Sequence, residues 1–174
     1  MARKRAARVA LPILIAVMAV AGLHVNASVS YAATPHAKGG VLDLSQWNPK
    51  SVFEITGEWE FYWNRLLIDS QIESSAEAFA IVEAPGEWNL YETGLGELPG
   101  LGLATYRVRV TGARPGEEYG LRVQNMASAY RLYADGELIG GNGAFGDKAD
   151  APVSDYRPQL GHFTAETDSF DIIL

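Results

Sequence analysis

Cysteine is absent from the 174 residues of this chain, and histidine occurs only three times. The lack of cysteine excludes disulfides, thiolate metal sites and a cysteine nucleophile. His24, His36 and His162 do not have the His-x-x-x-His spacing of a zinc motif. The Gly-x-Ser-x-Gly elbow of esterases is also missing. We therefore expect no enzyme activity from this chain, and no metal or other cofactor.

Positive charge is scarce beyond the first eight residues. The chain has 14 Lys and Arg against 21 Asp and Glu, and four of the basic residues are Arg3, Lys4, Arg5 and Arg8. The rest of the chain thus carries 10 basic against 21 acidic residues, a net charge of −11. Because such an acidic domain repels phosphate backbones, we expect no nucleic-acid partner.

The first 32 residues have the order of an export signal. A basic start, MARKRAAR, precedes the uncharged apolar run 9–23, and small residues follow it. The run has 15 residues, fewer than the about 20 that span a bilayer, so a cleaved signal peptide is favoured over a membrane anchor. We expect cleavage after Ala32, with cleavage after Ala27 as the alternative. The mature chain is then exported, either to the extracellular face of the cytoplasmic membrane or as a secreted protein.

The pattern of the remaining chain predicts an all-β fold. Residues 33–40 are interpreted as a flexible lead-in, and 41–174 as one domain. Asp135-Gly136 stands between two short apolar stretches and is typical of a hairpin turn. Strands at roughly ten-residue spacing, with no long helical pattern, predict a β-sandwich or jelly roll. The strands are expected at 41–44, 53–63, 81–84, 103–111, 119–123, 129–134, 137–140 and 169–174, with long loops at 87–102 and 141–156.

The stretch 57–63 reads GEWEFYW, with four aromatic residues in seven positions. A period of two places Trp59, Phe61 and Trp63 on one face and Glu58, Glu60 and Tyr62 on the other, acidic face. We interpret the ring-rich face as a core layer, with a ligand platform as the alternative. The acidic face is interpreted as solvated, and Gly57 as the position of a bulge.

The end of the chain is apolar. Residues 169–174 read SFDIIL, and a domain seldom ends on a buried run without a polar tail. We therefore expect that the domain is truncated at its C-terminus.

Several sequence blocks occur in one order that resembles a known fold. The blocks are ITGEWEF (55–61), APGEW (84–88), GLATYRV (102–108) and AYRLYADGELIG (129–140). Their order resembles the galactose-binding-like jelly roll, the N-terminal sugar-binding domain of family-two glycoside hydrolases such as β-galactosidase. GVLDLS (40–45), GEWEFYWNRLL (57–67) and GLATYR (102–107) are more similar to the extracellular domain of bacterial seven-transmembrane sensors, including histidine kinases. The resemblance covers residues 40–174.

This resemblance implies a non-catalytic function. The chain would be the extracellular sensing or ligand-binding domain of a bacterial membrane signal-transduction protein such as a sensor histidine kinase. It would reach the membrane through a C-terminal region that this sequence does not contain. The alternative is the non-catalytic carbohydrate-binding domain of a truncated family-two glycoside hydrolase. A carbohydrate or another small extracellular ligand is the expected partner in either case.

Candidate ligand-binding residues lie in and beside the two long loops, because loops at the rim of a rigid sandwich are where binding sites concentrate. Sugar sites pair an aromatic platform with planar polar groups. The candidates are Trp88, Asn89, Tyr91, Asn142, Tyr156 and Arg157. For Trp88 the alternative is a structural plug of the sandwich end, a role that the resemblance also implies.

Other charged residues are given structural interpretations. Arg107 and Arg131 are expected to neutralise neighbouring acidic side chains. Asp147, Asp150 and Asp155 supply too few oxygens for a calcium site, which needs six to eight.

Overall fold

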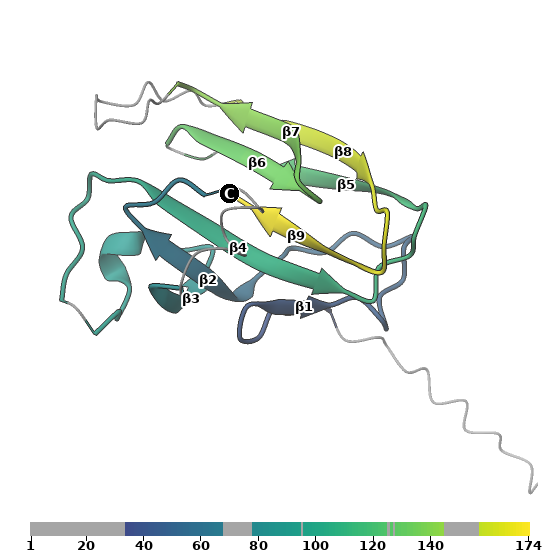
Figure 1. Ribbon diagram of the computed structural model, residues 1–174, viewed down its shortest axis with the longest axis horizontal. Coiled ribbons are helices and arrows are strands. Elements are labelled where there is room, and N and C mark those ends of the chain that lie inside the picture. Colours follow the sequence, from purple (N-terminus) through teal and green to yellow (C-terminus); the bar gives the residue numbers. More distant parts are fainter. Residues whose placement is uncertain (1–33, 68–77, 95, 125, 127, 145–156) are drawn as a thin grey trace, which may run out of the picture. The chain divides into compact units, whose positions relative to one another are not determined.

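The computed structural model describes residues 34–67, 78–94, 96–124, 126, 128–144 and 157–174. The predicted signal peptide, over residues 1–32, lies outside this part. The described residues form an all-β fold, in which no helix is long and apolar enough to cross a membrane. The elements are β1 (Val41–Asp43), β2 (Gly57–Trp63), β3 (Ala80–Ala84), the 3-10 helix η1 (Trp88–Leu90), β4 (Ala104–Thr111), β5 (Glu118–Val123), β6 (Tyr130–Ala134), β7 (Glu137–Asn142), β8 (Gln159–Thr164) and β9 (Ser169–Ile173) (Figure 1).

The strands form one large and one small sheet. The large sheet has the order β3-β2-β4-β9-β6-β7, and β5 and β8 form the small sheet. These pairs are all antiparallel. One side of β4 pairs with β2 along Ala104–Arg107 and then, in parallel, with β1 along Arg109–Thr111. The short strand β1 thus continues the sheet where β2 leaves it.

The two sheets pack face to face through aromatic rings. Phe163 of β8 meets Phe170 of β9 with ring centroids 4.8 Å apart, and Tyr119 of β5 lies 5.7 Å from Phe170. Trp47, from the segment before β2, stacks on Tyr119 at 6.1 Å. The rest of the inner face is covered by the segment between β3 and β4, whose Leu98 is buried. The all-β, two-layered prediction is therefore confirmed, with irregular segments completing the second layer.

The predicted alternation of β2 is confirmed, but the strand is shorter than predicted. Trp59 and Phe61 are buried in the core. The strand begins at Gly57 and not at Phe53, and Gly57 is its first residue and not a bulge. Gly57 has φ 115°, and a Cβ atom there would lie 2.3 Å from the carbonyl oxygen of Ala37. The contact with the N-terminal segment thus marks where pairing starts.

The N-terminal segment is hydrogen-bonded into the fold. The Ala37 N–H donates to the Thr56 carbonyl at 2.8 Å, and the Glu58 N–H donates to the Ala37 carbonyl at 2.9 Å. Ala37 is fully buried. The packed domain therefore begins inside the stretch 33–40, which the sequence alone marked only as a lead-in to Val41.

The predicted hairpin is confirmed, whereas one strand is missing from the prediction. Asp135 and Gly136 both have positive φ, at 50° and 76°, between β6 and β7. β8 was not predicted, because Gly161 interrupts its pattern. Gly161 is buried against β7, where a Cβ would lie 2.5 Å from the Ile139 carbonyl oxygen. Because the β7 backbone fills this space, the buried position holds glycine. The apolar side chain that would have indicated a strand in the sequence is therefore absent.

Candidate functional site

The first predicted site residue, Trp88, lies in η1 and is fixed by two contacts. Its ring meets Trp63 edge to face with centroids 5.4 Å apart. Its Nε1–H donates to the Pro99 carbonyl at 2.9 Å. Both contacts hold the segment between β3 and β4 on the end of β2. They support the structural interpretation of Trp88, which the sequence left open.

Tyr91 packs in the same aromatic cluster. Its ring lies 5.5 Å from Phe61 and 6.4 Å from Tyr106, between centroids. Burial raises the pKa of Tyr91, and the nearby Tyr106 hydroxyl offsets part of this rise. Burial also raises the pKa of Tyr106, and Tyr91 raises it further. Tyr91 therefore belongs to the core under η1, and its hydroxyl stays neutral.

The remaining predicted residues lie elsewhere or outside the described part. Asn89 is half-buried beside Trp88. Asn142 is buried at the end of β7, and its Oδ1 accepts from the Gly143 N–H at 3.0 Å. Arg157 is exposed just before β8, and Tyr156 lies outside the described residues. In the large sheet β4, β9 and β6 stand between β2 and β7. The structure thus divides the predicted site between two regions of the domain.

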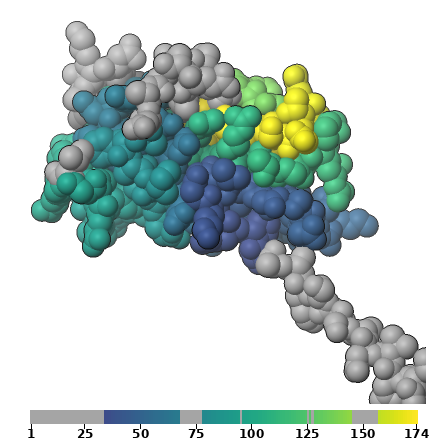
Figure 2. All heavy atoms as spheres, turned by 60° about the horizontal axis from the view of Figure 1, so that its bottom comes forward, coloured from purple at the N-terminus to yellow at the C-terminus, as the bar shows by residue number. Residues whose placement is uncertain are grey.

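Further apolar residues either touch Trp88 or lie within two residues of it or of its contact Pro99 in the chain. With Trp88 they form what we name the rim patch, defined as Trp63, Trp88, Leu90 and Leu101. Leu90 is 72% exposed and Leu101 is 84% exposed. Trp63 lies so close to the backbone at Gly102 that a Cβ there would be 2.2 Å from its Cη2. In Figure 2 the teal segment that carries η1 lies at the surface at one end of the domain. The rim patch combines fixed rings with two freely accessible leucines.

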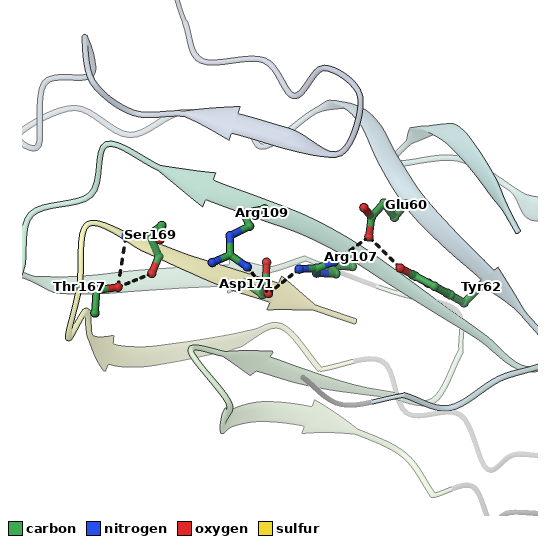
Figure 3. A network of polar contacts seen from close by, with 7 residues as sticks. All are labelled: Glu60, Tyr62, Arg107, Arg109, Thr167, Ser169 and Asp171. Atoms are coloured by element: carbon green, nitrogen blue, oxygen red, sulfur yellow. Dashed lines mark hydrogen bonds and ion pairs between the residues drawn. The ribbon is translucent and has the colours of Figure 1, made fainter. Parts of the chain in front are cut away.

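A network of polar contacts crosses the outer face of the large sheet (Figure 3). Arg107 of β4 lies between two carboxylates: its Nη1 is 3.1 Å from Glu60 Oε2 on β2, and its Nη2 is 2.8 Å from Asp171 Oδ2 on β9. Arg109 Nη1 is 3.4 Å from the same Asp171 oxygen. The Tyr62 hydroxyl donates to Glu60 Oε2 at 2.8 Å. These five residues, which we name the strand network, join three adjacent strands.

Burial makes the strand network a structural rather than a reactive arrangement. The side chains of Arg107 and Asp171 are only 14% and 8% exposed. Burial lowers the pKa of Arg107, but the charges and hydrogen bonds of Asp171 and Glu60 more than offset this and raise it overall. Burial and Glu60 raise the pKa of Tyr62 to about 12, although Arg107 opposes them. Arginine and tyrosine both keep their protons at neutral pH and act as hydrogen-bond donors.

The outer face is also covered by apolar packing. Tyr62 and Ile173 are buried there, with Leu67, Ala78 and Tyr133 packed against them. Thr105 Oγ1 donates to the Arg65 carbonyl at 2.8 Å and accepts from the Leu67 N–H at 3.0 Å. The chain that follows β2 is therefore attached to this face.

These contacts decide several predictions. Arg107 neutralises acidic neighbours, as expected. The interpretation of the Glu58 and Glu60 face as solvated is wrong, because Glu60 is half-buried and paired. Arg131 donates through Nη1 to the carbonyls of Tyr130 at 2.9 Å and Gly143 at 3.3 Å, and its pairing with an acidic side chain stays a prediction. Asp171 was missed, although a carboxylate inside the apolar run SFDIIL signals the need for a buried cation.

The described residues contain no group of three or more His, Cys, Asp or Glu side chains that could hold a metal ion. Asp147, Asp150 and Asp155 lie outside the described residues. No family model matches the chain, and neither a curated protein nor a solved structure matches it significantly. The site is therefore interpreted from its own residues.

Proposed function

We propose that this chain is a non-catalytic carbohydrate-sensing domain with a galactose-binding-like jelly roll, exported as part of a bacterial membrane signal-transduction protein such as a sensor histidine kinase. The rim patch is the observation that carries the proposal. Trp63 and Trp88 are immobilised by ring packing and by the bond to Pro99, so binding would not have to order them. Leu90 and Leu101 extend this surface into solvent.

The chemistry of the rim patch suits a sugar. The CH face of a pyranose packs on aromatic and aliphatic surface, while its hydroxyls need planar polar partners. Asn89 follows Trp88 in the chain and is half-buried, and its amide can both donate and accept a hydrogen bond. This neighbouring ring and amide support a carbohydrate ligand over a purely apolar one.

The same observation supports a second candidate function. A carbohydrate-binding domain of a family-two glycoside hydrolase would use the same surface, because its ligand has the same chemistry. The two candidates differ in what the gene encodes beyond codon 174. Several apolar spans of about 20 residues would support the receptor. A long α/β region would support the hydrolase.

Ligand binding is tested directly with the full chain. Thermal unfolding and titration calorimetry against a panel of mono- and oligosaccharides should reveal at least one sugar that stabilises the protein. Leu90→Ser together with Leu101→Ser should abolish this shift while leaving unfolding without sugar nearly unchanged, because both side chains are exposed. Val52→Ser is the matched control, since Val52 is 99% exposed outside the rim patch. Binding that survives the double variant, or no sugar binding at all, would refute the proposal.

A further inference from the structure

Within the part of the chain that the structure describes, strand β5 pairs with a neighbouring strand on one side only. Its residues pair with β8 from Glu118↔Thr164 to Val123↔Gln159 without a break in register. Among the described residues, no backbone hydrogen bond joins the other side of β5 to a further segment. Natural edge strands are usually protected by charged side chains, above all lysine, by proline, by a bulge or by a covering segment. The sequence of β5, EYGLRV, has neither proline nor lysine.

The alternation of the ladder defines which groups face the open side. The Ala165 N–H donates to the Glu117 carbonyl at 3.1 Å, next to the first β5–β8 pair. In an antiparallel ladder, every second residue directs its N–H and C=O to the same neighbour. The backbone N–H and C=O groups of Tyr119 and Leu121 then point to β8, whereas those of Glu118, Gly120 and Arg122 point away from it. The free edge thus presents the N–H and C=O groups of every second residue along the six-residue strand.

We propose that this edge pairs with the β5 strand of a second copy of the chain, antiparallel and about a two-fold axis through Gly120. This register places Glu118 opposite Arg122 of the second copy, and the symmetry repeats the pair. Opposite charges directly across an antiparallel pair are stabilising. At the axis, Gly120 faces Gly120 and no side chains collide. The two small sheets join into one sheet of the order β8-β5-β5-β8.

The side-chain pattern of β5 favours this register over its neighbours. An axis through Tyr119 would place Glu118 opposite Gly120, and an axis through Leu121 would place Arg122 opposite Gly120. Only the axis through Gly120 pairs both charges. It also places Tyr119 opposite Leu121 of the second copy on the inner face, where both side chains are now only half-buried. Charge and apolar contacts therefore select the same arrangement.

The test is the oligomeric state of the full chain, measured by sedimentation velocity over a range of protein concentrations. The wild type should show a reversible monomer–dimer equilibrium. Glu118→Arg or Arg122→Glu alone turns two attractive pairs into two repulsive ones, and each should weaken the dimer by about tenfold or more. The double variant with both substitutions restores opposite charges and should dimerise nearly as well as the wild type. Glu92→Arg, in the exposed segment after η1, is the control for a change in net charge.

A backbone variant separates pairing from side-chain charge. Gly120→Pro removes an N–H that faces the open side, and it should leave the ladder with β8 in place while abolishing the dimer. Circular dichroism reports whether this variant is folded. A wild type that stays monomeric at every concentration would overturn the proposal. So would a dimer that both single reversals leave unchanged, or a double variant that fails to recover.

Discussion

Arg107 on β4 and Asp171 on β9 meet across two adjacent strands, with Nη2 and Oδ2 2.8 Å apart. Because both side chains are largely buried, neither charge could be left alone without a large desolvation cost. Glu60 pairs with Arg107, and Arg109 pairs with Asp171. The four side chains together are two cations and two anions. The strand network thus joins β2, β4 and β9 through side chains, in addition to the hydrogen bonds of the ladder.

Removing the central cation should destabilise the protein strongly. Arg107→Met leaves Glu60 and Asp171 without their shared partner, and we expect a loss of about 3 kcal/mol in the free energy of unfolding. Arg109→Met is the control, because the Arg109 side chain is 43% exposed and its Nη1 lies 3.4 Å from Asp171 Oδ2. This variant should lose less than about 1 kcal/mol of the free energy of unfolding. Urea denaturation measures both values. Equal losses in the two variants would show that burial does not set the strength of these pairs.

Gly57 should tolerate no side chain. A Cβ there would lie 2.3 Å from the Ala37 carbonyl oxygen, and φ is 115°. We expect Gly57→Ala to cost more than about 2 kcal/mol, because it combines backbone strain with a collision between backbone atoms. Gly100→Ala is the matched change, since a Cβ at Gly100 would meet no atom within 4 Å. That variant should be neutral within about 1 kcal/mol, and thermal unfolding would distinguish the two.

Stability should fall in alkaline solution through Tyr62. Its pKa is about 12 in the folded protein, against 10.0 for an ordinary tyrosine. The unfolded chain then loses the Tyr62 proton first, so the stability due to the neutral hydroxyl is complete below pH 10 and declines between pH 10 and about 12. The stability difference between the wild type and Tyr62→Phe should narrow over the same range. A difference that stays constant up to pH 12 would contradict the raised pKa.

Trp88 should be needed for stability whatever it binds. Trp88→Phe removes the Nε1 donor to Pro99 and part of the contact with Trp63. We expect a loss of about 1–2 kcal/mol, because a hydrogen bond and some apolar area disappear together. Leu90→Ala, two residues away and exposed, should change the free energy of unfolding by less than about 0.5 kcal/mol. Chemical denaturation of the two variants provides the comparison, and a neutral Trp88→Phe would contradict the structural interpretation.

Local patterns were enough to predict most of the sheet. The period of two in β2 and the Asp135-Gly136 turn are properties of neighbouring residues, and the structure confirms them. β8 was not predictable, because buried Gly161 is explained only by the Ile139 backbone beside it. The start of β2 was misplaced for a similar reason, since Ala37 is 20 residues from Gly57 in the chain.

For the candidate site too, residue types could be predicted from the sequence, whereas contacts between distant segments could not. Aromatic and amide residues in the loop 87–102 could be recognised from the sequence, because sugar-binding chemistry depends on residue type. Their packing could not, since Trp88 and Tyr91 are held by rings of Trp63 and Phe61 on a strand distant in sequence. The partners of Arg107 were equally hidden, because Asp171 lies 64 residues further along the chain.

By itself, then, the sequence determined the all-β class, the core-facing side of β2 and the absence of cysteine chemistry, because these follow from composition and short-range periodicity. The tertiary structure decided which charges are buried together and which rings support the rim patch. Those properties depend on register and on the order of strands in the sheets. Residues such as Glu60, Arg107 and Asp171 acquire their environment only when three separate segments pair.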